Sequence, residues 1–467
     1  MPRIWLIPFV VASALFMENM DATVIATSLP AIAADLGEDP VILKLAFTSY
    51  LLSLAVFIPI SGWCADRYGA RRVFQAAIAT FTLASIWCAS AGSLAELVAA
   101  RTLQGLGGAM MVPVGRLIVL RAVPKHRLVS AMAYLTVPAL VGPVIGPPLG
   151  GFITTYFHWR WIFWINVPVG IIGIALAWAF MPNTRAEHSP PLDLTGFLLS
   201  GLALSALIFG FSTLGRSLFP GAVAPSLVVV GAILGIAYWH HQRRTAHPIL
   251  NLDLLRVPTF RSSVLGGSLF RIGAGAIPFL LPLMLQVGFG LDPFTSGSLT
   301  FVAAAGAIAM KFTAHPILKA FGFRAVLTVN ALISASFLLA MGLFTAATPF
   351  WLIIAVLLTG GFFRSLQFTS LNAIAYADVA HERMSQATSL AGVAQQFSAS
   401  AGVAFAALAV EAARAVRGDV SLEPADFMIG FFAVAAVTAL SALSHARLSP
   451  DAGAEVSGRP AERAAGE

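Results

Sequence analysis

Charged residues are scarce in this chain: Asp, Glu, Lys and Arg make up only 10% of its 467 residues, while 58% are hydrophobic. Soluble domains carry about 25% charged residues. A chain of this length with so little charge cannot cover a water-facing surface, which excludes an ordinary soluble enzyme. The mean hydropathy of +0.85 places the chain in a lipid bilayer instead.

Cysteine is also nearly absent. Cys64 and Cys88 form neither a CxxC pair nor a metal-binding spacing, and we interpret both as small apolar helix residues. The sequence has no phosphate-cradling P-loop, so we expect no ATP hydrolysis and no cofactor, and an ion gradient as the energy source. Strand-like alternation is missing, which argues against a membrane barrel.

Apolar segments of about 20 residues, long enough to cross a bilayer as helices, recur along the chain. The first begins like a secretory signal peptide, but its apolar run continues to Pro30 and contains acids, which favours a membrane helix. We predict fourteen spans, near residues 8–32, 43–62, 74–92, 96–119, 130–153, 161–181, 192–213, 222–240, 262–287, 296–315, 325–344, 349–372, 386–409 and 427–445.

Lysine and arginine are distributed unevenly between the loops that these spans create. With the N-terminus in the cytoplasm, 18 basic residues fall on the cytoplasmic side and five on the other. Because cytoplasmic loops carry an excess of Lys and Arg, this bias predicts that both termini are cytoplasmic. It also accounts for the net charge of +7 without a nucleic-acid partner. The tail 449–467 is rich in Ala, Gly and Glu and is predicted to be disordered.

Three short segments recur in the same order later in the chain, at nearly constant offsets of 263, 253 and 256 residues. The pairs are RTLQ (Arg101–Gln104) with RSLQ (Arg364–Gln367), DRYGARRV (Asp66–Val73) with KAFGFRAV (Lys319–Val326), and Val123–Ala131 with Val379–Ala387. Repeated halves are typical of secondary transporters. We therefore predict two six-helix bundles, 1–181 and 257–448, separated by two inserted helices and a linker at 182–256.

Acidic residues are nearly absent from the predicted spans. Only Glu18 and Asp21 fall in a span interior, and their spacing of three places them on one face of the first helix. An acid in the membrane costs at least about 2.5–3.5 kcal/mol and is a functional-site hypothesis by default. We interpret both as proton-coupling candidates, and the alternative is a structural pairing with a membrane arginine.

Basic residues also fall within or near span interiors. Arg116 and Lys311 lie near predicted cytoplasmic ends, where a long side chain can reach the interface. Arg101, Arg271 and Arg364 are deeper, where they either face a cavity or pair with acids. We assign Arg101 to proton coupling with the two acids, and treat Gln104, Arg271, Arg364 and Gln367 as cavity candidates.

Four segments match family motifs: MDATVIATSLP (Met20–Pro30), GWCADRYGARR (Gly62–Arg72), RTLQGLGGA (Arg101–Ala109) and GPVIGPPLGG (Gly142–Gly151). On these residues the chain resembles the major facilitator superfamily and, more closely, its fourteen-span drug:proton antiporters. GGAMMVPVGRL and RIGAGAIPF resemble the multidrug exporters of the MdtD type. The resemblance implies an all-α polytopic fold of two six-helix bundles plus two inserted helices. Glu18 is not a position carried over from the family.

The fifth predicted span carries an unusual run of glycine and proline. In a helical bundle, small residues let helices approach closely. Neighbouring helices supply hydrogen bonds to the backbone groups that a proline leaves unpaired. The resemblance associates this GxxxGPxxGG motif with exchange rather than symport. The physical reason we give is that a closely packed helix seals one half of the protein against the other. Its residues are Gly142, Gly146, Pro147, Gly150 and Gly151.

The loop after the second span carries the motif that the superfamily shares. The resemblance implies a conformational latch in which a carboxylate meets the positive end of a neighbouring helix. Its residues are Gly62, Asp66, Arg67, Gly69, Arg71 and Arg72. For the arginines, simple anchoring at the cytoplasmic interface is the alternative. The second copy has Lys319 in place of Asp66 and is not expected to act in the same way.

Two enzyme-like patterns carry little weight. HSPPLD (His188–Asp193) spells the H-x4-D pattern of acyltransferases, but Asp193 is better interpreted as a helix cap. His240, His241 and His247 have no Cys or acid at ligand spacing, so we predict no metal site. We therefore expect no enzymatic activity.

The sequence as a whole predicts a proton-coupled antiporter that exports amphipathic drug-like compounds across the bacterial cytoplasmic (inner) membrane by alternating access. The alternative is a narrow-substrate exporter of a metabolite, siderophore or lipid. We expect a monomer in the lipid bilayer that binds a small amphipathic substrate and no nucleic acid, and the sequence identifies no accessory periplasmic partner. We also expect Asp21→Asn to uncouple transport from pH while leaving the fold intact.

Overall fold

A computed structural model describes residues 3–38, 44–185, 191–213, 222–291, 293–418 and 423–459, and every regular element within them is a helix. The first bundle comprises α1 (Arg3–Leu36), α2 (Lys44–Phe57), α3 (Ser61–Tyr68), α4 (Ala70–Ser90), α5 (Leu94–Ala122), α6 (Leu128–Tyr156), α7 (Trp161–Trp164) and α8 (Asn166–Phe180). Two helices follow, α9 (Leu194–Thr213) and α10 (Val223–Arg244). The second bundle comprises α11 (Pro258–Arg261), α12 (Gly267–Leu283), α13 (Pro293–Lys311), α14 (Ala314–Gly342), α15 (Phe350–Ile374), α16 (Met384–Arg417) and α17 (Pro424–Ala446).

Twelve helical segments among the described residues are long and apolar enough to cross a membrane. The other two predicted spans coincide with α6 and α13, which are helical but are not among those twelve. The all-helical membrane fold predicted from hydropathy is therefore confirmed, whereas the number fourteen stays a prediction.

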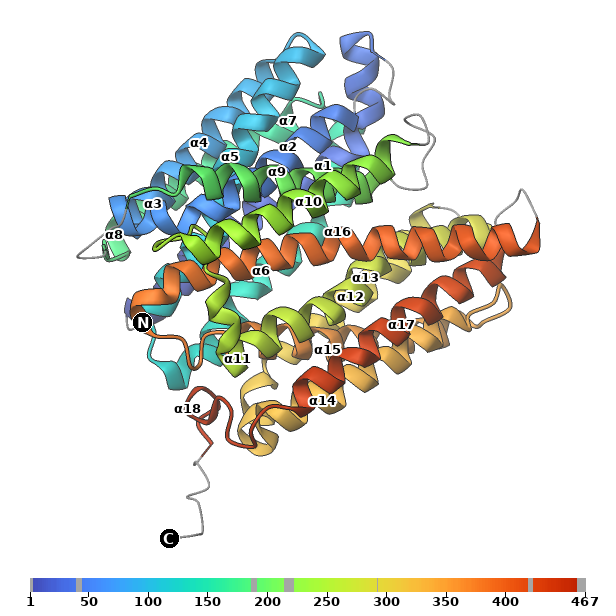
Figure 1. Ribbon diagram of the computed structural model, residues 1–467. Helices are drawn as coiled ribbons and strands as arrows, with labels where there is room; N and C mark the ends of the chain where they lie inside the picture. The colour runs from blue at the N-terminus through green and yellow to red at the C-terminus, as the bar shows by residue number, and fades with distance from the viewer. Residues whose placement is uncertain are drawn as a thin grey trace.

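The helices form two facing layers (Figure 1). The blue to cyan helices of the first bundle lie on one side, and most yellow to red helices of the second bundle lie on the other. α16 runs along the boundary and contacts α3 and α5, while α6 contacts α13 and α15. The start of α1, the end of α3 and the short helix α18 (Ala454–Ser457) lie at one end of the molecule, which we call the terminal face (Figure 1).

The inserted helices pack beside the bundles rather than inside them. α9 contacts α2 of the first bundle and α16 of the second, and α10 contacts α9. Asp193 caps α9 as predicted, because its Oδ1 accepts a hydrogen bond from the Gly196 amide at 2.8 Å. His241 of α10 lies 2.8 Å from the same carboxylate. His188 of the H-x4-D pattern lies outside the described residues.

The predicted repeat has a matching backbone feature. Gly69 and Gly322, which are 253 residues apart, have φ angles of 95° and 73°. These angles lie in a region that side-chain-bearing residues rarely adopt, so glycine permits the sharp turn between two helices at both places. The second turn interrupts α14, which is two helices joined across that kink. The weakly similar segments Asp66–Val73 and Lys319–Val326 therefore contain equivalent turns in the two bundles.

Small residues set the distance between α13 and α15. A Cβ atom on Gly306 would overlap the carbonyl oxygen of Leu358, and one on Gly361 would overlap that of Ala303. The contact is reciprocal, with each helix presenting a glycine to the other's backbone. Close approach of this kind is how membrane helices gain packing energy in the absence of a hydrophobic driving force.

Gly306→Ala is therefore expected to destabilise the protein by about 1–3 kcal/mol, because the two backbones must move apart. Gly297→Ala is the matched control, since it lies on the same helix with open space around its Cβ position. The measurement is the midpoint of unfolding in detergent for both variants. Equal midpoints would show that the α13–α15 contact adapts without cost.

The tail contains more structure than its composition predicts. Helix α18 packs against α14 and the short helix Lys125–Arg127, and Val456 is completely buried. Glu455 lies 3.3 Å from Lys125, which joins the tail to the first bundle through an exposed ion pair. The structure contradicts the predicted disorder as far as residue 459, because the apolar side chains of Ala452 and Val456 are buried in the hydrophobic core.

A polar cluster at the opposite end of the molecule connects the end of α1 to the segment before α7. Trp159 Nε1 donates to Asp35 Oδ2 at 3.0 Å, and Arg160 Nη1 donates to the same oxygen at 2.7 Å. The hydrogen bond from Trp159, followed by the contact with Arg160, holds the pKa of Asp35 below its usual value. The cluster joins the end of α1 to the segment before α7, where the sequence places aromatic residues at a membrane boundary.

Candidate functional site

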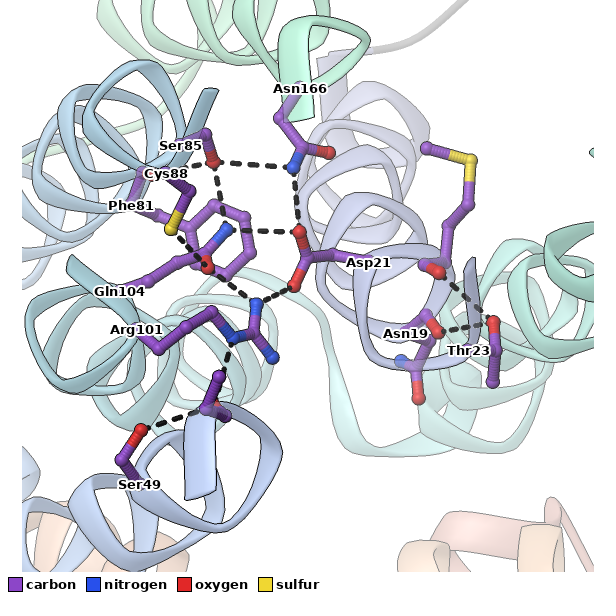
Figure 2. A network of polar contacts seen from close by, with 12 residues as sticks. Asn19, Asp21, Thr23, Ser49, Phe81, Ser85, Cys88, Arg101, Gln104 and Asn166 are labelled. Atoms are coloured by element: carbon purple, nitrogen blue, oxygen red, sulfur yellow. Dashed lines mark hydrogen bonds and ion pairs between the residues drawn. The ribbon is translucent and has the colours of Figure 1, made fainter. Parts of the chain in front are cut away.

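Asp21 lies at the centre of a buried polar network inside the first bundle (Figure 2). Its Oδ2 accepts a hydrogen bond from Arg101 Nη1 at 2.6 Å, which is also an ion pair. Its Oδ1 accepts from Gln104 Nε2 at 3.0 Å and from Asn166 Nδ2 at 2.9 Å. This carboxylate is 3% exposed and accepts hydrogen bonds from three side-chain donors, one of which is charged.

Arg101 is completely buried and is held on several sides. Besides Asp21, it donates to Gln104 Oε1 at 2.5 Å and to the Ala46 carbonyl at 3.4 Å. Its guanidinium carbon lies 4.3 Å from the centre of the Tyr50 ring, a cation–π arrangement. The ion pair therefore links α1, α2 and α5. A buried charge of this kind is tolerated only when its partner is present.

Local helix geometry brings these side chains together. Arg101 and Gln104 are one turn apart on α5, so both face α1. Ser85 of α4 accepts a hydrogen bond from Gln104 at 2.8 Å, and Asn166 begins α8. Sequence analysis did not identify Ser85 or Asn166. The signal for Asn166 is an amide in an otherwise apolar span, which is costly unless it is hydrogen-bonded.

Glu18 has a different environment from Asp21. Its side chain is 9% exposed, and among the described residues its buried Oε2 has no hydrogen-bond partner. The Tyr50 hydroxyl is also buried, and it has no hydrogen-bond partner among the described residues either. Both groups lie within about 3.5 Å of the position that a Cβ on Gly108 would take. The structure thus brings all three proton-coupling candidates into one bundle, but only Asp21 and Arg101 pair.

The loop carboxylate Asp66 joins the two bundles at the terminal face. Its Oδ1 accepts from Arg121 Nη2 at 2.8 Å, and its Oδ2 accepts from the Ser385 hydroxyl. Ser385 lies in the first turn of α16, so the carboxylate contacts a helix of the other bundle through this hydroxyl. Arg121 is a partner that sequence analysis missed, since it ends α5 and is 55 residues away.

The remaining latch residues divide into two groups. The Gly62 amide donates to the Ser389 hydroxyl at 2.9 Å, and a Cβ on Gly62 would lie 2.6 Å from the Ser385 carbonyl oxygen. Gly69 makes the sharp turn, and Arg71 donates to the Met181 carbonyl at 3.3 Å. The two other latch arginines, Arg67 and Arg72, are exposed.

Two glycines of the GxxxGPxxGG motif, Gly142 and Gly146, face the first helix of their own bundle. A Cβ on Gly142 would lie 3.0 Å from the Met20 amide nitrogen, and one on Gly146 would overlap the Thr23 hydroxyl. The glycine stripe therefore brings α6 against the segment of α1 that carries Asp21. Gly150 is buried, and Gly151 has open space around it. Pro147 lies within α6, but its side chain is outside the described part of the structure.

The cavity candidates have unequal surroundings. Gln104 is completely buried in the Asp21 network, and its repeat partner Gln367 is equally buried, accepting from Asn330 at 2.8 Å. These two glutamines fill their bundles rather than line an open space. Arg364 lines a small cavity in the second bundle of about 10 Å³, together with Phe270 and Phe337. Arg271 is buried, donates to the Ser263 carbonyl and lies within electrostatic reach of Arg116 of the first bundle.

Two facing helical bundles, with charged groups buried inside them and a hydrogen-bonded contact between them, define a secondary membrane transporter rather than an enzyme. A family model described as Major Facilitator Superfamily matches residues 11–403. The chain belongs to this superfamily, and it is a multi-pass membrane protein.

Similar proteins agree with this assignment. The chain is 36% identical to a multidrug resistance protein MdtD of Pectobacterium atrosepticum over 95% of both chains. It is 37% identical to the protein of that name in Escherichia coli, over 96% of this chain and 95% of the relative. The human organic anion transporter MFSD10 superposes with a TM-score of 0.69 at 15% identity, covering 95% of this chain and 100% of its own. The proton:xylose symporter XylE gives 0.66 at 14% identity, covering 94% of each chain.

Proposed function

We propose that this protein exports amphipathic drug-like compounds across the bacterial cytoplasmic membrane in exchange for protons, with both termini in the cytoplasm. The name of its MdtD relatives and the complete GxxxGPxxGG motif support this function. The uneven distribution of Lys and Arg supports the orientation. The two bundles would move against each other so that a central site opens to each side of the membrane in turn.

The observation that carries the proton coupling is the contrast between Glu18 and Asp21. Asp21 is bound by three donors, so protonating it would break an ion pair. Glu18 has a buried oxygen without a described donor, and an ionised carboxylate is costly in such surroundings. Glu18 is therefore the group that gains and loses the proton, while Asp21 and Arg101 keep a fixed arrangement beside it.

The contacts between the bundles support alternating access. Ser389 binds Gly62, Ser385 binds Asp66, and Lys125 pairs with Glu455, all near the terminal face. These bonds close the face that the orientation places in the cytoplasm. A proton can shift the equilibrium between open and closed states only if its affinity differs between them. Movement of α1 as the bundles separate would change the exposure of Glu18 and supply that difference.

The test uses everted vesicles with an acid interior and a dye that reports the pH gradient. Several unrelated amphipathic compounds should each trigger proton release from vesicles that contain the wild-type protein. In Glu18→Gln, triggered release should fall by at least roughly tenfold, because the exchangeable carboxyl group is gone. Glu382→Gln removes an exposed carboxyl group and is the matched control.

Each result has a distinct meaning. Release by several compounds, lost only in Glu18→Gln, supports a polyspecific antiporter coupled through that residue. Release by a single metabolite, siderophore or lipid would favour the narrow-substrate alternative. Normal release in Glu18→Gln would remove that residue from the coupling mechanism. No response to any compound, from protein shown to be folded, would contradict drug export.

A further inference from the structure

Basic side chains without a carboxylate partner gather in the second bundle and at its contact with the first. Among the described residues, none of the following forms an ion pair: Arg116, Arg271, Lys311 and Arg364. The sequence explains why, because only Asp292, Asp378 and Glu382 are acidic between residues 258 and 410. Of these, Asp378 and Glu382 are exposed.

Two of these arginines come from opposite bundles and lie near each other. Arg116 of α5 is 5% exposed, and Arg271 of α12 is 6% exposed. They are close enough for their charges to interact, and Tyr376 is within electrostatic reach of Arg271 as well. Arg116 also donates to the Tyr376 hydroxyl at 3.4 Å. The tyrosine of the second bundle therefore accepts a hydrogen bond from Arg116 and lies within electrostatic reach of Arg271.

The hydrogen bonds of the two arginines are few and go to neutral groups. Besides Tyr376, Arg116 donates to Gln395 Oε1 at 3.4 Å, and Arg271 donates to the Ser263 carbonyl at 3.2 Å. In both arginines the Nε–H group is buried and has no partner in the described residues. A guanidinium group carries five N–H donors, and the contacts with described residues use only part of this donor capacity.

This arrangement is electrostatically unfavourable unless a negative group joins it. Two like charges repel strongly where water is excluded, and neutral acceptors compensate only partly for lost hydration. A carboxylate, sulfonate or phosphate would accept hydrogen bonds from both guanidinium groups, which match the planar or branched oxygens of such anions. The anion would also remove the repulsion between the two bundles where they meet.

We propose that Arg116 and Arg271 bind the negatively charged head group of an amphipathic anion, which this protein exports. The inference rests on the proposed function and names the class of its substrate. The anion enters while the terminal face is open, and the two bundles close over it because it neutralises both arginines. The same chemistry could be supplied by an anionic phospholipid head group, and the experiment separates the two sources.

The experiment measures binding to purified protein in nanodiscs by equilibrium dialysis. The probes share a naphthalene body and differ in charge: naphthalene-2-sulfonate, the neutral naphthalene-2-sulfonamide, and a naphthyl trimethylammonium cation. The sulfonate should bind best to wild-type protein. Arg116→Gln and Arg271→Gln should each weaken its binding by about tenfold or more, because each removes charge-assisted hydrogen bonds. Arg271→Lys should retain part of the affinity.

Controls distinguish loss of the site from loss of the fold. Arg261→Gln removes an exposed arginine and should leave sulfonate binding unchanged. Both buried-site variants should fold at least as well as the wild type, because each removes one of two repelling charges. Sulfonate should raise the midpoint of unfolding of the wild type only. Nanodiscs of phosphatidylcholine alone should support the same binding as those containing phosphatidylglycerol.

The outcomes also separate this inference from the proposed function. Proton release triggered by the cation, with no arginine-dependent sulfonate binding, would overturn the anion site and leave proton-coupled export standing. Arginine-dependent sulfonate binding without proton release by any compound would preserve the site and contradict the antiporter. Sulfonate binding that both arginine variants retain would overturn the inference. So would competition by phosphatidylglycerol that abolishes binding, because the site would then belong to lipid.

Discussion

Asp21→Asn is expected to lower the free energy of unfolding by about 3–5 kcal/mol, because it leaves Arg101 as a buried charge without its partner. Arg101 is completely buried, and its ion pair with Asp21 is 2.6 Å long. The neutral amide cannot compensate for the positive charge. An unfolding titration in mixed detergent micelles measures the effect. This expectation replaces the sequence-based one, in which the same substitution leaves the fold intact.

A double variant tests whether the loss of stability comes from the unpaired charge or from the altered side-chain shape. Asp21→Asn combined with Arg101→Gln removes both charges, so most of the lost stability should return. Asp35→Asn supplies the matched control, since Asp35 lies on the same helix in an exposed ion pair with Arg160. That change should cost less than about 1 kcal/mol. If Asp21→Asn proved no more damaging than Asp35→Asn, the ion pair would have no structural role.

Hydropathy predicted the helical membrane fold because burial in lipid is a local, additive property of each segment. The repeat also aligns Gly322 with Gly69, and the structure has a positive-φ turn at both positions although their flanking residues differ. Backbone conformation explains why: both turns need a positive φ, which keeps glycine when other residues change. Hydropathy does not reveal a buried apolar contact in a polar tail, so the site of Val456 was not predicted.

Pairings inside the bundles were only partly predictable. The sequence placed Asp21 and Arg101 in spans and left a structural pairing open, which is the arrangement the structure shows. It did not indicate that Asn166, 145 residues beyond Asp21, completes the shell. The loop motif likewise gave no indication that Asp66 binds Arg121, which it does because α3 and α5 end side by side. Such pairings depend on how helices cross, which one sequence does not encode locally.

Gly62→Val is expected to hold the terminal face open and to reduce transport by at least roughly tenfold, because the added side chain occupies the space of the other bundle. A Cβ at this position would lie 2.6 Å from both the Ser385 carbonyl oxygen and the Ser389 hydroxyl. The new atoms would also displace the bond from the Gly62 amide to Ser389. Closure, rather than folding of either bundle, should therefore fail.

Labelling of a single cysteine measures this closure. The variant Gln395→Cys is made in a protein whose Cys64 and Cys88 are replaced by Ala. Its labelling rate measures how accessible the contact between the bundles is, since Gln395 of α16 faces Arg116 of α5. The closure penalty of about 1–3 kcal/mol predicts maleimide labelling roughly 5- to 150-fold faster in Gly62→Val. Gly235→Val, on α10 with open space around it, should change neither labelling nor transport. Because alternating access needs both closed and open states, unchanged labelling together with normal transport in Gly62→Val would show that this contact does not gate the protein.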